Sequence, residues 1–143
     1  GRLLNNPDNS LNESKNIVKE NDVRCPEPNP MASQLSGGNL QKFILGRSLA
    51  NKPKIAIFSQ PTWGVDIGAA TAIRQKLLNL AQTGKAVIVI SQDLEEIFQL
   101  SDKIAVLNNG NLSEVLSADD ISAANIGLLM GGNSITQDSF QRK

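Results

Sequence analysis

A polar, glycine-rich turn that runs into a helical pattern carries the residues of this chain best suited to chemistry. It consists of Leu35, Ser36, Gly37, Gly38, Asn39, Leu40 and Gln41. Adjacent glycines let the backbone approach a ligand closely, a serine can cap a helix or offer a hydroxyl, and the first N–H groups of a helix lack internal partners. This combination is typical of an anion site at a helix N-terminus. An ordinary capped helix start has the same residues, so the turn by itself leaves both interpretations open.

Composition restricts the other chemistry. The 143 residues include 14 basic and 14 acidic ones, a balance that does not favour nucleic acid or an anionic membrane surface as the main partner. Histidine is absent, which removes the commonest general base and metal ligand. The single cysteine, Cys25, cannot form an internal disulfide and fits a reducing compartment. We therefore expect neither a metal enzyme nor a thiol enzyme, and the apolar runs are too short to span a membrane.

Apolar periodicity predicts an α/β fold around the turn. A capping box over residues 10–13 predicts a short polar helix ending near Asn21, and three closely spaced prolines predict an irregular connector after it. Amphipathic patterns predict helices over residues 37–50, 67–82 and 94–100. Apolar runs over residues 54–58 and 86–90 predict two strands, and the first is expected to be buried on both faces.

The last third of the chain adds a hairpin to this pattern. Asn109 and Gly110 lie between two apolar segments, which is a strong hairpin signal. The order strand, helix, strand, helix, hairpin predicts a largely parallel sheet with an added antiparallel edge. Ser117 is expected to cap a final helix that ends near Met130, where Gly131 follows.

Four blocks in order resemble the motifs of the ATP-binding cassette (ABC) ATPases. Residues 35–41 resemble the signature motif, 55–66 the Walker B strand and D-loop, 89–97 the switch region, and 101–115 the strand and hairpin that follow it. The signature sequence, with Gln-Pro-Thr after the first strand, is most similar to the second cassette of tandem ATPases in sugar and nucleoside importers. The resemblance implies a P-loop NTPase-like parallel sheet with flanking helices and a C-terminal hairpin, of which this chain is a partial domain.

The resemblance also implies roles for individual residues. In this family, the signature of one cassette contacts the terminal phosphate of ATP held by a partner cassette. The residues that would contact this ATP are Ser36, Gly37, Gly38, Asn39 and Gln41 of the signature, with Asp66 of the D-loop. For Asp66 the structural alternative is to cap the helix that begins at Ile67. Lys42 is expected to be a solvated helix charge.

Three positions depart from the family pattern. The Walker B strand ends in Ser59 and Gln60, where the family has two carboxylates that support Mg²⁺ and the attacking water, and Gln92 replaces the switch histidine. Serine is a weak neutral ligand for Mg²⁺, and glutamine cannot accept a proton from water. Loss of one acid–base group typically costs about 10² to 10⁴ in rate. The resemblance therefore implies that this cassette's own site is degenerate, with no intact catalytic residue and no metal ligand.

The phosphate-binding loop Gly-x-x-x-x-Gly-Lys-Ser/Thr is missing from the sequence. Because the family places this loop well upstream, the chain is expected to be the C-terminal part of a cassette. We predict that residues 1–35 are the end of a helical subdomain and a proline-rich connector, 36–132 the cassette part, and 133–143 a disordered tail. This fragment alone is not expected to bind ATP tightly or to hydrolyse it.

The resemblance implies an ATP-binding subunit of an importer for simple sugars or nucleosides, which uses ATP and Mg²⁺ in the full-length protein. Expected partners are another ABC cassette, transmembrane permease subunits and, indirectly, a substrate-binding protein, at the cytoplasmic face of the membrane. The alternative is a non-catalytic dimerisation or regulatory cassette without a transport role. A cassette of DNA repair or translation is disfavoured because the chain has zero net charge and no basic stripe, so no nucleic-acid partner is expected. Trp63 is expected to pack or to form an interface contact.

Overall fold

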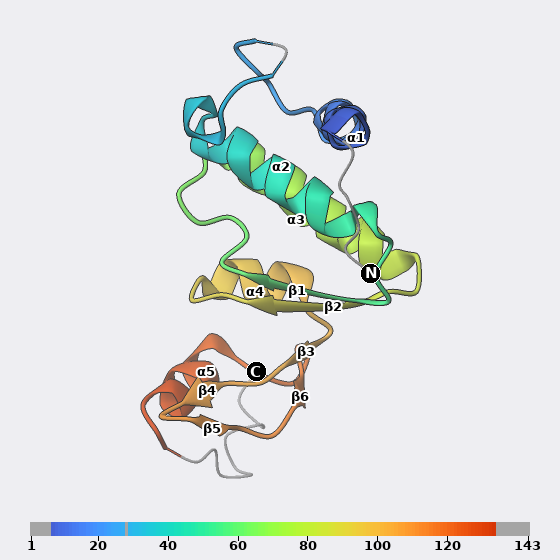
Figure 1. Ribbon diagram of the computed structural model, residues 1–143. Coiled ribbons are helices and arrows are strands. Elements are labelled where there is room, and N and C mark those ends of the chain that lie inside the picture. Colours follow the sequence, from blue (N-terminus) through green and yellow to red (C-terminus); the bar gives the residue numbers. More distant parts are fainter. Residues whose placement is uncertain (1–6, 28, 134–143) are drawn as a thin grey trace. The chain divides into compact units, whose positions relative to one another are not determined.

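The computed structural model describes residues 7–27 and 29–133. The chain forms two compact units that divide between Ile90 and Ser91. The first unit contains, in chain order, α1 (Pro7–Glu20), the 3₁₀ helix η1 (Ala32–Gln34), α2 (Gly37–Ala50), β1 (Ile55–Ser59), α3 (Ile67–Gln82) and β2 (Ala86–Ile90) (Figure 1). The second contains α4 (Leu94–Leu100), β3 (Lys103–Ile104), β4 (Leu107–Asn108), β5 (Asn111–Leu112), β6 (Leu116–Ser117) and α5 (Ala123–Met130). Predicted tail residues 134–143 lie outside the described residues.

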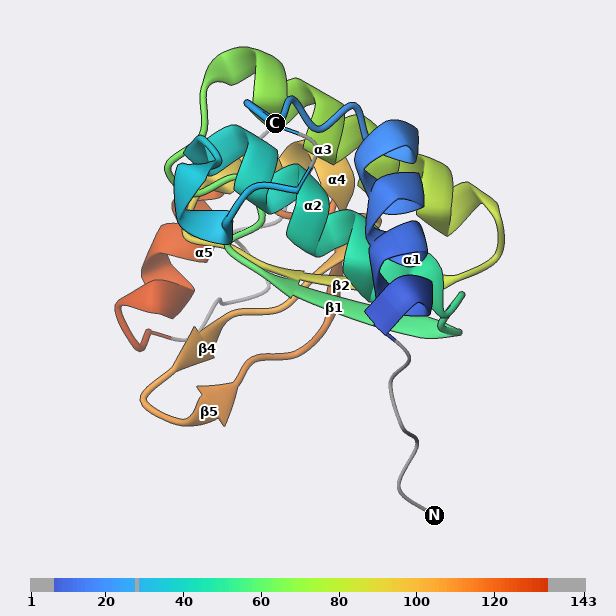
Figure 2. The same cartoon turned by 45° about the horizontal axis from the view of Figure 1, so that its top comes forward.

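The three α-helices described in the first unit pack on one another around an apolar core. α2 contacts both α1 and α3, and Figure 2 shows α1 and α3 on either side of α2, with β1 and β2 beyond them. The buried side chains include Ile17 of α1, Leu45 of α2, and Ile73 and Leu77 of α3. The predicted bounds of α2 and α3 are confirmed. These bounds follow from local signals, because a serine or aspartate caps each N-terminus.

α1 begins earlier than the sequence predicted. The capping box placed the helix start at Ser10, but the helix runs from Pro7 to Glu20. Ser10 therefore lies inside the helix, and its carbonyl accepts a hydrogen bond of 2.8 Å from the hydroxyl of Ser14 one turn later. Proline is well suited to the first turn of a helix, where its missing N–H has no partner to lose. Pro7 therefore overrides the capping box as the start signal.

β1 and β2 form a parallel pair, as predicted, but only one face of the pair is buried. In register, Ile55 lies opposite Ala86 and Ser59 opposite Ile90. Exposure alternates along β1, from 61% at Ile55 to 8% at Ala56 and 63% at Ile57. The prediction that β1 is buried on both faces is therefore wrong for this chain. Helices cover one side of the two strands, and the second side is open to solvent within the first unit.

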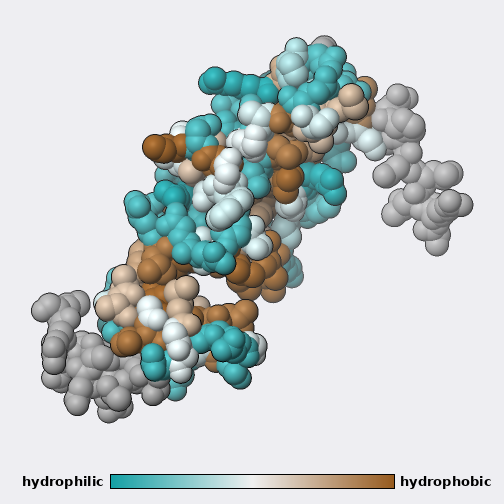
Figure 3. All heavy atoms as spheres, turned by 90° about the vertical axis from the view of Figure 1, so that its left-hand side faces the viewer, coloured by the Kyte–Doolittle hydropathy of each residue, from teal (hydrophilic) through white to brown (hydrophobic). Residues whose placement is uncertain are grey.

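Other large apolar side chains are also exposed on the described surface. On the face shown in Figure 3, brown apolar patches lie between teal hydrophilic regions. Trp63, in the turn between β1 and α3, is 71% exposed. Of the two expected roles of Trp63, packing or interface contact, this exposure favours the second, which stays a prediction. Cys25, by contrast, is half-buried.

The second unit contains the predicted hairpin but in a different sheet arrangement. β4 pairs with β5 through Asn109 and Gly110, both of which have positive φ, as a two-residue hairpin turn requires. β3 pairs with β6, and the ladders of the described residues are three separate two-stranded sheets. The prediction that the hairpin extends the parallel sheet is therefore wrong. Strands of two residues make few ladder bonds, so the apolar cluster of the second unit contributes most of the stability there.

That cluster consists of Ile104, Val106, Ile121 and Ile126, with partly buried side chains of α4 packed against it. The last helix of the described residues, α5, begins at Ala123 with Ser122 as its cap, whose Oγ accepts a 3.2 Å bond from the N–H of Asn125. The prediction of Ser117 as the cap is wrong, because Ser117 pairs with Lys103 in the β3–β6 ladder. Among residues 7–27 and 29–133, no helix has the length and hydropathy needed to cross a bilayer.

Candidate functional site

Ser36 occupies the N-cap position of α2. Its backbone is extended, with φ −62° and ψ 156°, and its Oγ accepts hydrogen bonds from the backbone N–H of Asn39 at 3.4 Å and from Asn39 Nδ2 at 2.9 Å. The capping interpretation of this serine is confirmed. Capping uses Oγ only as an acceptor, so the hydroxyl hydrogen stays available to a further group.

The two glycines of the turn bring α2 close to the start of α3. A Cβ at Gly38 would lie 2.9 Å from Cβ of Ala69, and a Cβ at Gly37 would lie 3.0 Å from the carbonyl oxygen of Gly64. Both separations are shorter than normal side-chain contacts. Glycine is therefore required at position 38 by the packing of α2 on α3, whatever ligand the turn contacts.

Asp66 caps α3 beside this turn. Its Oδ1 accepts a hydrogen bond of 2.8 Å from the backbone N–H of Ala69, and the residue is exposed. Its Oδ2 would lie 3.6 Å from a Cβ at Gly38, so the carboxylate borders the glycine turn. The capping role weighed for Asp66 is confirmed. The sequence thus brings an acidic side chain, a serine hydroxyl and two helix N-termini to one surface of the first unit.

Asn39 and Gln41 follow inside α2. The Oδ1 atom of Asn39 accepts a hydrogen bond of 2.8 Å from the backbone N–H of Arg24, while its Nδ2 donates to Ser36. Sequence patterns had not indicated that the connector after α1 contacts the turn. Gln41 is half-buried, one turn into the helix.

Ser59 and Gln60 lie at the carboxyl end of β1. Ser59 is exposed and pairs with Ile90, and the N–H of Gln60 donates a 2.7 Å bond to the carbonyl of Ile90. Gln60 has a φ of +50°, a left-handed conformation that is unusual for a residue other than glycine, asparagine or aspartate. Gln92 belongs to the second unit, where it is exposed in the turn before α4.

Comparison of the sequence and the fold with known proteins identifies the family of this chain. The chain is 39% identical over 122 residues to the guanosine import ATP-binding protein NupO of Bacillus subtilis, covering 85% of this chain and 24% of that protein. It is 44% identical over 110 residues to the fructose import ATP-binding protein FruK of Bifidobacterium longum, covering 76% of this chain and 21% of that protein. A solved dimeric ATP-binding cassette, MJ0796 bound to ADP and Pi, matches with a TM-score of 0.66 and 25% identity over 82% of this chain and 51% of that one. The chain belongs to the ATP-binding cassette ATPases.

This ABC chain spans about a quarter of the length of the curated relatives, 24% of NupO and 26% of the nucleoside import protein NupA of Lactococcus lactis. No family model matches it. The α/β fold with a parallel strand pair, expected from the resemblance, is confirmed by the solved cassettes. The partial domain is confirmed as well, since the chain covers 51% of the solved MJ0796 cassette.

The donor set at the end of β1 does not fit Mg²⁺. A magnesium ion in a nucleotide site is usually bound by carboxylates together with phosphate oxygens. Ser59 and Gln60 supply no charged oxygen, and the next acid, Asp66, already caps α3. Among the described residues, no group of three or more histidines, cysteines, aspartates or glutamates is placed to hold a metal ion. No catalytic step through Mg²⁺ can be derived from this chain's own strand.

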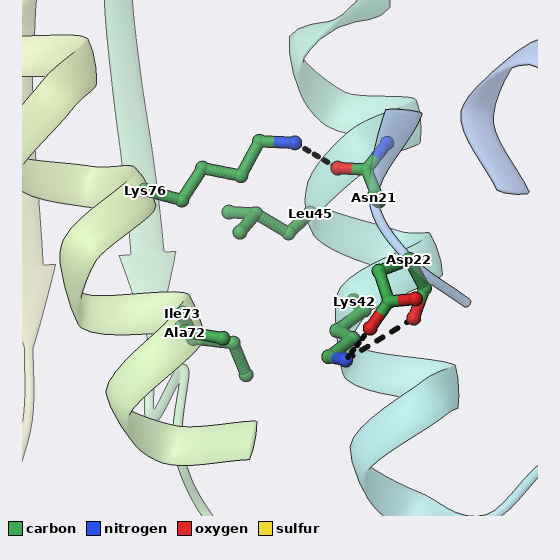
Figure 4. A pocket seen from close by; sticks show the side chains of 7 residues that line it. All are labelled: Asn21, Asp22, Lys42, Leu45, Ala72, Ile73 and Lys76. Atoms are coloured by element: carbon green, nitrogen blue, oxygen red, sulfur yellow. Dashed lines mark hydrogen bonds and ion pairs between the residues drawn. The ribbon is translucent and has the colours of Figure 1, made fainter. Parts of the chain in front are cut away.

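A small pocket of about 90 Å³ lies where α1 ends against α2 and α3 (Figure 4). Lys42 of α2 donates to the backbone carbonyl of Asp22 at 3.1 Å and pairs with its carboxylate at 3.3 Å, and only 18% of the Lys42 side chain is exposed. The prediction that Lys42 is a solvated charge is therefore wrong. Asp22 has a φ of +49°, and this left-handed turn directs the end of α1 toward α2.

Lys76 of α3 lines the same pocket and donates to Oδ1 of Asn21. Burial lowers the pKa of Lys76 below its ordinary value of 10.5, and the negative charge of Glu20 offsets part of this effect. Helical periodicity places Lys76 beside the buried face of α3, because it follows Ala69 by seven residues and Ile73 by three. The sequence Asn21-Asp22 is a second signal, because these residue types tolerate the left-handed turn that ends a helix.

Proposed function

We propose that this chain is the C-terminal part of the second cassette in the ATP-binding subunit of an importer. In this proposal it supplies the signature turn to ATP bound on another cassette, while its own Walker B and switch positions are degenerate. Relatives named as guanosine, nucleoside and fructose import ATP-binding proteins support uptake of simple sugars or nucleosides. The full-length protein would use ATP and Mg²⁺ and would work with a second cassette, permease subunits and, through them, a substrate-binding protein, at the cytoplasmic face of the membrane.

One observation carries the proposal: within the first unit, the start of α2 has groups that can contact a phosphate, whereas the carboxyl end of β1 lacks charged oxygens. The start of α2 has a capping serine with a spare hydroxyl hydrogen, and Asp66 is beside it. The end of β1 has only Ser59 and Gln60. The start of α2 therefore suits contact with a phosphate, whereas the carboxyl end of β1 lacks the charged oxygens that metal binding and water activation require.

ATP would supply the phosphoanhydride bond whose hydrolysis powers transport, and this chain's residues would orient the terminal phosphate from the side opposite the cassette that binds ATP. The Ser36 hydroxyl can donate a hydrogen bond to a terminal phosphate oxygen, and the first-turn N–H groups of α2 present the positive end of the helix. Such a dipole contact contributes only about 0.3 to 1 kcal/mol at an exposed site. The turn would thus make ATP bridge two cassettes and would not bind ATP tightly alone.

The test compares two substitutions in the full-length protein. Ser36→Arg is expected to abolish transport-coupled ATP hydrolysis, because a large side chain at the cap blocks approach to the phosphate. Gln60→Ala is expected to change the rate little, because glutamine there accepts no proton. Equal losses from the two substitutions would contradict the proposed asymmetry.

A second measurement concerns the 143-residue chain alone. Since it has neither a phosphate-binding loop nor Walker B carboxylates, we expect no measurable ATP turnover from the purified chain with Mg²⁺ present. Metal-dependent hydrolysis by this chain would show that the missing parts are not needed. The alternative function is a non-catalytic dimerisation or regulatory cassette. It predicts that this chain binds a partner cassette without raising the partner's ATPase rate.

A further inference from the structure

The side-chain amide of Asn39 bridges two segments of the first unit. Its Oδ1 accepts from the backbone N–H of Arg24 at 2.8 Å, and its Nδ2 donates to Oγ of Ser36 at 2.9 Å. Arg24 lies in the connector after α1, and Ser36 begins α2. Asn39 is half-buried, so its amide is held between the connector and the signature turn.

The N–H of Arg24 fixes which way round this amide lies. A backbone N–H can only donate, so the amide atom that faces it at 2.8 Å must be the oxygen. The NH₂ group of Asn39 then faces Ser36 and can only donate to it. The chemical identity of each partner thus follows from the backbone contact.

These contacts determine what the Ser36 hydroxyl can do. A hydroxyl oxygen has two acceptor positions and one hydrogen. Asn39 directs two donors at this oxygen, Nδ2 at 2.9 Å and its backbone N–H at 3.4 Å. The hydroxyl therefore does not donate to Asn39, and its hydrogen is left available to a third group. Ser36 is exposed, so a ligand can be that group.

We propose that Asn39 is a positioning residue that keeps the Ser36 hydroxyl as a hydrogen-bond donor toward the terminal phosphate of ATP on a partner cassette. This inference rests on the proposed function. Ionised phosphate oxygens accept hydrogen bonds, and bonds to a charged acceptor are roughly twice as strong as neutral ones. A hydroxyl whose donor direction is fixed in advance loses less orientational freedom when it meets the phosphate. The backbone of Arg24 contributes to this arrangement without touching a ligand.

A double-mutant cycle in the full-length ATPase that contains this chain tests the proposal. Ser36→Ala and Asn39→Ala are each expected to lower kcat by about tenfold, with a smaller change in KM for ATP. In the Ser36→Ala background, Asn39→Ala should lower kcat by less than about twofold, because the group that it positions is already gone. Thermal unfolding of each variant separates these effects from loss of the helix cap.

A merely structural role for Asn39 predicts another result. The substitution would then lower kcat by the same factor whether or not the Ser36 hydroxyl is present. Such a multiplicative loss would overturn the positioning role while leaving the proposed function intact. If Ser36→Ala and Ser36→Arg both leave hydrolysis unchanged, the signature does not act on the partner's ATP, and both proposals fall.

An isosteric substitution gives a second, independent test. In Asn39→Asp the carboxylate can still accept from Arg24 but has no N–H for Ser36, so it would draw the hydroxyl hydrogen toward itself and away from the phosphate. We expect about a tenfold or greater loss of kcat with little change in melting temperature. Gln75→Glu makes the same amide-to-acid change on α3, where the amide nitrogen of Gln75 donates to Asn79, and should leave kcat unchanged. Wild-type kcat in Asn39→Asp would overturn the proposal.

Discussion

At the scale of single residues, Gly38 shows how packing and function act on the same position. The missing side chain lets α2 approach α3, and an added methyl group would meet Ala69 at 2.9 Å. Helix packing therefore accounts in part for glycine at position 38 and at the neighbouring position 37, without any ligand. The close packing of this turn against the start of α3 would also hold its backbone N–H groups in place at the surface.

Gly38→Ala is expected to destabilise the chain by about 1 to 3 kcal/mol, because overpacking a close helix contact forces both helices to shift. The matched variant Ala69→Gly removes the methyl group that Gly38→Ala would meet, so the double variant should recover part of the loss. Urea unfolding of the two single variants and the double variant measures this coupling. Additive losses in the double variant would show that the contact with Ala69 is not the cause.

Lys76 has a testable consequence at the same scale. Its pKa is lowered in the folded chain, so between that pKa and 10.5 the unfolded chain binds more protons than the folded one. The free energy of unfolding should therefore rise with pH through this window, whereas it gains nothing from Lys76 at lower pH. Lys76→Met should remove this rise, and Lys54→Met, at an exposed position of the same unit, should retain it. Unfolding curves at several pH values check both variants; an identical pH dependence in Lys76→Met and the wild type would contradict the burial effect.

At the scale of elements, the caps account for what the sequence predicted well. Ser36, Asp66 and Asp93 each accept hydrogen bonds from the following backbone, and the helices that they begin have the predicted bounds. Both Ser117 and Ser122 could cap α5, and the sequence pattern predicted Ser117, whereas the cap is Ser122. The β3–β6 ladder decided that choice, and such pairing between residues far apart leaves no local signal.

The candidate site shows the same division. The starts of α2 and α3 and their cap residues followed from the sequence, because each depends on neighbours within four residues. β1 lies one residue later than predicted, at Ile55–Ser59. The contact of Arg24 with Asn39 and of Lys42 with Asp22 did not, because each joins residues separated by 15 or 20 positions. These contacts depend on how α1 lies against α2, which amphipathic periodicity leaves undetermined.

The cap of α3 carries a prediction that belongs to this scale. Asp66→Ala should cost about 1 kcal/mol of stability, because the N–H of Ala69 loses its acceptor, whereas Asp66→Asn keeps an oxygen at the cap and should cost less. Thermal unfolding measures both. If the proposed function is correct, Asp66→Asn should still reduce ATPase activity in the full-length protein, since the D-loop charge is lost. Equal stability losses in the two variants would contradict the capping role.

At the scale of the whole molecule, one face of the β1–β2 pair is apolar and exposed in this chain. Ile55 and Ile57 of β1 and Ile88 and Ile90 of β2 are all exposed, and the register places Ile57 opposite Ile88. Contiguous apolar surface of this kind is unusual on a stable monomer. Since the chain covers about half of the solved cassettes, we expect the remaining half to cover this face in the full-length protein.

The chain alone should therefore bind an apolar fluorescent dye in its folded state. Replacing Ile57 and Ile88 together by threonine keeps the β-branched shape that strands favour but removes much of the apolar surface, so dye fluorescence should fall severalfold while the helix content remains. Val115→Thr, which removes an exposed apolar group from the second unit, should leave the signal nearly unchanged. The full-length protein should give little dye fluorescence with or without the two threonines, because its own upstream strands and helices would exclude the dye. Strong dye binding by the full-length protein that the threonines reduce would show that this face stays open, and would point to a surface used for something other than completing the cassette.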